Sequence, residues 1–77
     1  MNPTTQAIIA RLPKKPLLSP ADIAAAYGLA TTNTIIADIK TGLLAANTVG
    51  GRYIVSHSAA EQYIATNEYR PDEGIVK

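Results

Sequence analysis

The chain has 77 residues, of which 47% are hydrophobic and 17% charged, and its formal net charge is +1. This length and composition are typical of one small globular domain and exclude a chain that is disordered throughout. Cysteine is absent, which excludes disulfides and thiolate metal sites, and no apolar run approaches the 18 residues of a membrane span.

The N-terminal segment predicts a short helix followed by a linker. Asn2 can cap this helix and Pro3 suits its first position, because the N–H that proline lacks would be unpaired there. Three apolar residues fall on one face of the helix: Ile8, Ile9 and Leu12. We therefore treat residues 1–16 as an N-terminal helix and linker.

The stretch SPADIAAAYG predicts a second helix with clear signals at both ends. Ser19 is the expected N-cap, Pro20 the first helical residue, and Asp22 occupies the acidic position of a capping box. Gly28 ends the helix, since glycine adopts the left-handed conformation without steric cost.

The next stretch, TTNTIIADIKTG, predicts a third helix. Thr31 or Thr32 can cap it, and Ile35 and Ile39 lie four residues apart and are expected to face inward. Two short helices joined by a tight turn have the spacing of a helix-turn-helix motif.

The stretch VGGRYIV predicts a β-hairpin. Its β-branched and aromatic residues favour strands. Gly50 and Gly51 allow the positive backbone angles that a two-residue hairpin turn requires. A hairpin placed directly after a helix-turn-helix motif is a wing.

The segment SHSAAEQYIATNEY predicts the last helix. Either Ser56 or Ser58 is expected to cap this helix, and Ser58 has capping-box spacing to Glu61. Pro71 is expected to end the helix. The residues expected to pack inward are Tyr63 and Ile64. We expect residues 69–77 to form a flexible tail.

Four quoted segments, LLSPADIAAAYGL, NTIIADIKTGLL, VGGRYIV and AAEQYI, follow one another in an order that is similar to one known family. Residues 17–65 resemble the excisionases, small MerR-like winged-helix proteins that include the recombination directionality factors of temperate phages. The resemblance implies an α+β winged helix-turn-helix domain, which we place at residues 17–68.

The resemblance also implies a function. Excisionases are DNA-binding architectural proteins that bind repeated sites cooperatively, bend DNA and direct an integrase toward excision. The implied partners are double-stranded DNA, a tyrosine or serine integrase, and further copies of the chain on adjacent sites. The implied location is the cytoplasm of a bacterial host cell, without a membrane partner.

Individual residues suggest how the DNA would be held. In a major groove, Asn33 can bond to adenine, Thr32 can contact a thymine methyl or a phosphate, and Lys40 can contact a phosphate. Arg52 at the hairpin tip can enter a minor groove or bind a phosphate, and Asp38 should point away from the DNA. The expected contact residues are Lys14, Lys15, Ser19, Thr31, Thr32, Asn33, Ala37, Lys40, Gly50, Gly51, Arg52 and Tyr53.

Each of these features also has a purely structural interpretation. Arg52 can simply keep a hairpin edge soluble, small polar residues at a helix start are often caps, and linker lysines are often only solvated. Two other functions therefore stay open. One is a MerR-like transcriptional regulator, and the other is a winged helix that binds proteins, which the near-neutral charge favours.

Nothing in the sequence indicates catalysis. His57 is the only histidine, and we expect it at a helix start on the surface, without a metal partner set. No nucleophile, base and orienting group can be assembled, so we expect no enzyme activity, no cofactor and no metal.

Overall fold

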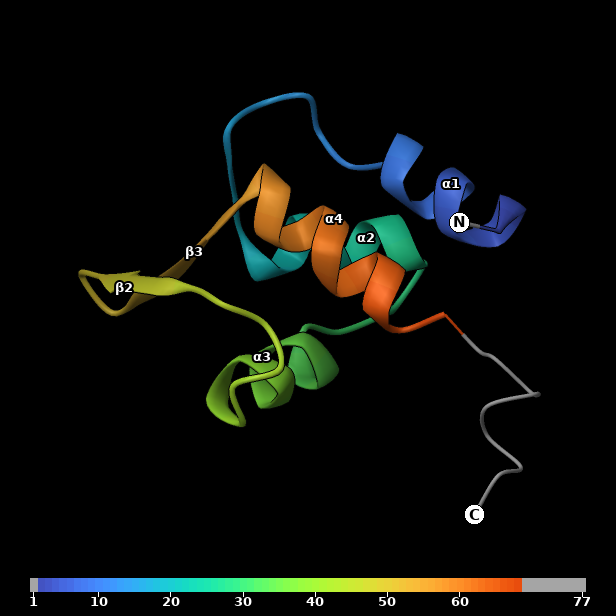
Figure 1. The fold of residues 1–77 in the computed structure, drawn as a ribbon. Helices are drawn as coiled ribbons and strands as arrows, with labels where there is room; N and C mark the ends of the chain where they lie inside the picture. The colour runs from blue at the N-terminus through green and yellow to red at the C-terminus, as the bar shows by residue number, and fades with distance from the viewer. Residues whose placement is uncertain (1, 69–77) are drawn as a thin grey trace, which may run out of the picture.

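The computed structural model describes residues 2–68, which form four helices and a three-stranded antiparallel sheet (Figure 1). In chain order the elements are α1 (Pro3–Ala10), β1 (Leu17–Leu18), α2 (Pro20–Tyr27), α3 (Asn33–Lys40), β2 (Asn47–Val49), β3 (Arg52–Ser56) and α4 (His57–Thr66). The fold is α+β as expected, and its elements are compatible with a helix-turn-helix followed by a wing. The expected tail, residues 69–77, lies outside the described residues.

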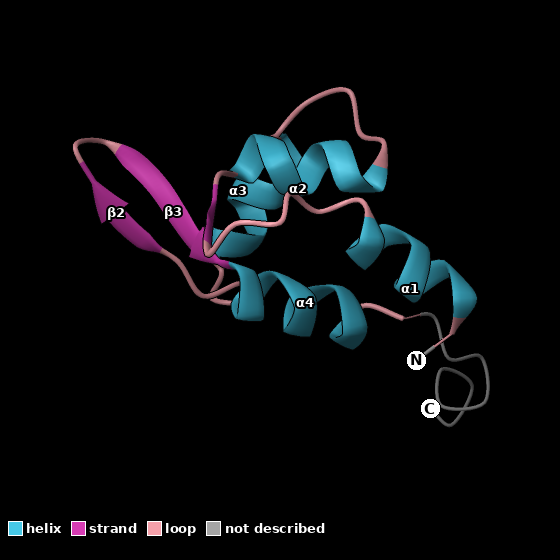
Figure 2. Cartoon of the chain, turned by 90° about the horizontal axis from the view of Figure 1, so that it is seen from above, coloured by secondary structure: helices cyan, strands magenta, loops and turns pink. Residues whose placement is uncertain are grey.

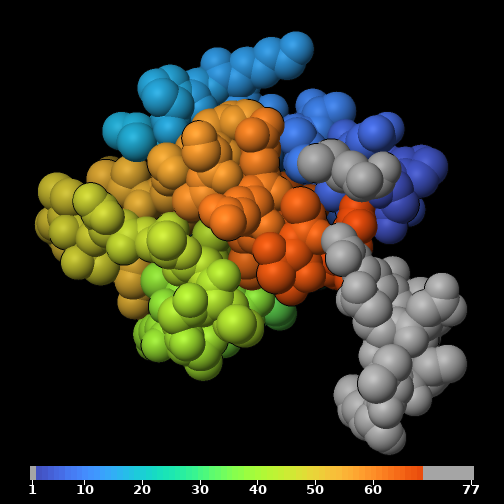
Figure 3. Space-filling model, viewed as in Figure 1, coloured from blue at the N-terminus to red at the C-terminus, as the bar shows by residue number. Residues whose placement is uncertain are grey.

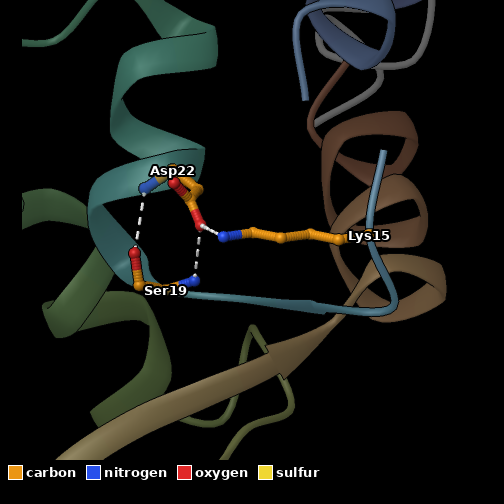
Figure 4. Close-up of polar contacts among 3 residues, drawn as sticks. All are labelled: Lys15, Ser19 and Asp22. Carbon is orange, nitrogen blue, oxygen red and sulfur yellow. Dashed lines mark hydrogen bonds and ion pairs between the residues drawn. The ribbon is translucent and has the colours of Figure 1, made fainter. Parts of the chain in front are cut away.

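The first two helices begin as their sequences predict. The Oδ1 of Asn2 accepts a hydrogen bond from the Thr5 N–H at 2.7 Å at the start of α1. At the start of α2, the Ser19 hydroxyl accepts from the Asp22 N–H, and the Asp22 carboxylate accepts from the Ser19 N–H (Figure 4). Gly28 ends α2 with a φ of 77°, so the predicted capping box and glycine stop are both confirmed.

The start of α3 differs from the prediction. Thr32 occupies the N-cap position, but its side chain makes no capping hydrogen bond. Instead the Thr31 hydroxyl accepts from the Asn33 N–H at 3.4 Å, which is a local turn contact at the limit of hydrogen-bond distance. Helix α3 therefore depends on packing more than on a cap.

The two ends of α4 correct part of the prediction. The Ser56 hydroxyl accepts from the Ala59 N–H at 3.0 Å, so Ser56 is the cap and the alternative box of Ser58 with Glu61 is wrong. Strand β3 leads directly into the helix at His57, which places Ser58 inside the first turn. The helix ends at Thr66, before Pro71, which lies outside the described residues.

The hairpin has the predicted two-residue turn. Val49 pairs with Arg52 across Gly50 and Gly51, whose φ angles are 57° and 76°. Strand β3 also pairs on its other side with β1, which the sequence analysis missed. Two residues are too few for an alternating pattern, so β1 has no signal of its own.

One core joins all the elements except β2, whose three residues are exposed. Its buried residues are Leu12, Leu18, Ile23, Ala24, Ala26, Ile35, Leu44, Val55, Ala60, Tyr63 and Ile64. Helix α1 packs against α4 and α2, and Ile8 and Ile9 lie half-buried against the same core. The predicted face of α1 is therefore confirmed for Ile8 and Ile9, whereas Leu12 is buried from the segment beyond the end of the helix, and Thr5 is the buried residue of the helix itself. No helix within residues 2–68 is long and apolar enough to cross a membrane.

Candidate nucleic-acid interface

The hairpin β2–β3 extends away from the helices, and α3 lies beside its base (Figure 1, Figure 2). Arg52 follows the turn directly and is exposed. Within residues 2–68, its guanidinium forms no ion pair with a carboxylate. A Cβ added to Gly50 or Gly51 would meet no atom within 4 Å, so the turn tip is open to solvent.

Helix α3 presents a polar exposed face. Its members, with the residue that follows the helix, are Asn33, Thr34, Ala37, Lys40 and Thr41. Of the four residues expected on this face, Asn33, Ala37 and Lys40 are exposed, whereas Thr32 is half-buried. Thr34 and Thr41 were missed, although their spacing of three and four residues from Ala37 places them on the same face.

Asp38 borders this face but is held away from it. The Tyr63 hydroxyl of α4 donates a hydrogen bond to the Oδ2 of Asp38. Burial raises the pKa of Tyr63 above its usual value, and the hydrogen bond to Asp38 raises it further. The hydroxyl therefore remains a donor at neutral pH, and the expectation that Asp38 points away from the exposed face is consistent with this contact.

Lys15 and Arg52 are brought to one region of the surface. Together with Ser19 and Tyr53 they line a hollow of about 340 Å³ between the sheet and the start of α2. The Lys15 Nζ lies 3.6 Å from the Asp22 Oδ2, so part of its charge is neutralised (Figure 4). Ser19 is half-buried, and its hydroxyl proton stays free to donate because the oxygen is the capping acceptor.

Lys14 lies elsewhere. It lines a separate hollow of about 550 Å³ with residues of α1 and with His57 and Glu61 of α4. The connector that contains Lys14, residues 11–16, runs along the opposite side of the molecule from α3 (Figure 1). Lys15 lines this hollow too, but the structure places Lys14 away from the expected contact residues of α3 and the hairpin.

In the described part of the chain, the acidic side chains all have partners, whereas several cationic side chains do not. Each acidic residue within residues 2–68 meets a donor: Asp22 meets Lys15, Asp38 meets Tyr63, Glu61 meets His57, and Glu68 accepts from the Asn2 N–H. Among the cations of residues 2–68, three have side chains without a hydrogen bond or ion pair: Lys14, Lys40 and Arg52. Among the described residues, no carboxylate pairs with Lys40 on α3 or with Arg52 on the hairpin.

The remaining polar groups of the described part differ in kind from the cations above. No group of three or more His, Cys, Asp or Glu side chains within residues 2–68 could hold a metal ion. His57 begins α4 as expected, and its Nδ1 lies 3.5 Å from the Glu61 Oε2.

Comparison with protein-family models, curated proteins and solved structures finds no match for this chain. On the surface of the molecule, α3 and the hairpin form neighbouring parts of one face (Figure 3).

Proposed function

We propose that this chain is a winged helix-turn-helix protein that binds double-stranded DNA, with α2 and α3 as the motif and β2–β3 as the wing. In this proposal α3 enters a major groove and the wing contacts an adjacent minor groove or phosphate. The excisionase resemblance extends the proposal to a non-catalytic architectural role in the bacterial cytoplasm, directing an integrase toward excision.

One observation supports this proposal above the others. An exposed, unpaired Arg52 stands at the tip of a projecting hairpin, beside a helix face that contains Asn33 and Lys40 and no carboxylate among its described residues. Free cations favour phosphate binding, and an asparagine on a helix in the major groove can read a base.

The number of cations limits the affinity of a single copy. Lys15, Lys40 and Arg52 are the cations near the proposed interface, and Lys15 is already paired with Asp22. About three neutralised phosphates correspond to weak binding by one copy. Copies on adjacent sites would then gain occupancy through effective concentration, in line with the cooperative binding that the resemblance implies.

Substitution of Arg52 tests the proposal. Arg52→Ala is expected to weaken duplex binding about tenfold, because one groove or phosphate contact is lost, with little change in melting temperature. The measurement is fluorescence anisotropy of a labelled duplex at low salt, with circular dichroism melting in parallel.

Lys14→Ala is the matched control, since Lys14 is also an exposed cation but lies by the α1–α4 hollow. Its affinity should stay within about twofold of the unsubstituted chain, the size expected when a distant charge is removed. Equal losses in both variants would indicate only non-specific attraction, and no binding at high micromolar concentration would refute DNA binding.

A protein-interaction module is the second candidate, and one feature favours it. Leu17 and Val49 are 57% and 60% exposed, and strand register places both on the outer face of the sheet with Ile54.

A transcriptional regulator would use the same DNA interface as an excisionase. Footprinting over an integrase attachment site and over the promoter of the chain's own gene would separate the two.

A further inference from the structure

Asp38 connects three parts of the molecule. Its carboxylate accepts the hydrogen bond of the Tyr63 hydroxyl across 25 positions of sequence. Its backbone carbonyl accepts from the Leu43 N–H at 2.9 Å, from the Leu44 N–H at 3.3 Å and from the Thr41 hydroxyl at 3.2 Å. One residue of α3 thus contacts both α4 and the segment that leads into the wing.

The partner of Asp38 is itself fixed. Tyr63 is 6% exposed and packs edge-on against Tyr27 of α2, with ring centroids 6.2 Å apart. A buried ring in such a pair has little rotational freedom, so its hydroxyl reaches α3 from a defined direction. The hydrogen bond therefore limits how α3 can rotate about its own axis.

The hydrogen bond from Tyr63 also affects where the negative charge of Asp38 lies. On a helix, Asp38 neighbours Thr34 and Thr41, which belong to the exposed face of α3. Without the Tyr63 hydroxyl, the half-buried carboxylate of Asp38 would lose its donor, and it could turn toward the exposed face of α3 to be hydrated there. A carboxylate there would repel phosphate and oppose the charge of Lys40.

We propose that Asp38 and Tyr63 are positioning residues for the DNA interface: their hydrogen bond orients α3 and keeps a negative charge off its exposed face. This inference rests on the proposed DNA binding. It adds a determinant that makes no contact with DNA itself.

A set of three variants tests the charge effect. Tyr63→Phe removes the donor and keeps the ring, and it should weaken duplex binding about fivefold at low salt, as expected when a like charge approaches phosphate. Asp38→Asn keeps an oxygen that can accept the bond and removes the charge, so it should bind at least as tightly as the unsubstituted chain. The double variant Tyr63→Phe with Asp38→Asn should recover the affinity lost in Tyr63→Phe alone.

Tyr27→Phe is the matched control. It removes the hydroxyl of the other ring in the pair, which is not the donor to Asp38, and should leave affinity unchanged. If Tyr63→Phe binds as well as the unsubstituted chain, the inference is overturned. A double variant as weak as Tyr63→Phe would overturn the charge effect.

Amide hydrogen exchange tests the orientation of α3 without DNA. Tyr63→Phe should raise exchange rates in residues 33–44 severalfold, while Tyr27→Phe should not. If the unsubstituted chain fails to bind DNA, the proposed function fails, and the exchange result still decides whether the bond holds α3. Unchanged exchange in Tyr63→Phe would overturn that part of the inference.

Discussion

Two isoleucines of α3 differ in how far they enter the core. Ile35 is 1% exposed, whereas Ile39 is only half-buried against the core cluster. Both were expected to face inward from their spacing, and both do. The degree of burial depends on what lies opposite each side chain, and it sets how much each contributes to stability.

Truncating these two residues should give unequal losses. Ile35→Ala is expected to lower the free energy of unfolding by about 2–4 kcal/mol, because it removes buried methyl groups and leaves a cavity. Ile39→Ala should cost about 1–2 kcal/mol, since part of its surface already meets water. Urea unfolding followed by circular dichroism measures both, and equal losses would contradict the burial difference.

At the scale of elements, local chemistry determines where helices and turns begin and end. Ser19, Asp22 and Gly28 set the bounds of α2, and two glycines set the hairpin turn. Where two serines compete for one cap, as at the start of α4, the choice depends on where the preceding strand ends.

The cap of α4 makes this choice measurable. Ser56→Ala should lower the free energy of unfolding by about 1 kcal/mol, because the Ala59 N–H loses its acceptor. Ser58→Ala should change it by less than about 0.5 kcal/mol, since Ser58 is exposed within the first turn. A larger loss for Ser58→Ala would show that the helix begins two residues later.

The wing depends on its second glycine. Gly51→Val should disrupt the hairpin and reduce duplex binding, because a β-branched residue is strained at a φ of 76°. Gly51→Asn is the control, since asparagine tolerates this backbone region. The readout is the nuclear Overhauser contact between Thr48 and Tyr53, which face each other across the strands. Its survival in Gly51→Val would contradict the assigned turn.

At the scale of the whole molecule, packing covers two groups of side chains that could otherwise contact another protein. The apolar residues of α1 lie against the core, and Tyr63 is buried and bonded to Asp38. The outer face of the sheet, with Leu17 and Val49, is an exposed apolar surface, and Leu29 and Leu43 are exposed as well.

Salt dependence reports how many cations the whole interface uses. With about three neutralised phosphates, duplex affinity should fall about 40-fold between 50 and 200 mM salt. Arg52→Ala should lower the slope of log affinity against log salt by about 0.9, and Lys14→Ala should leave it unchanged. Anisotropy titrations at several salt concentrations measure the slope. A slope of six or more would require cations beyond those placed at this interface.

The sequence by itself determined the helices, their caps at Asn2 and Ser19, the hairpin turn and the α+β class, because these depend on interactions within a few residues. Only the tertiary structure decided that β1 pairs with β3, that Lys15 lies near Arg52 while Lys14 does not, and that Asp38 meets Tyr63. These contacts join residues far apart in the chain. Their formation depends on how buried faces pack against one another, which a local pattern does not encode.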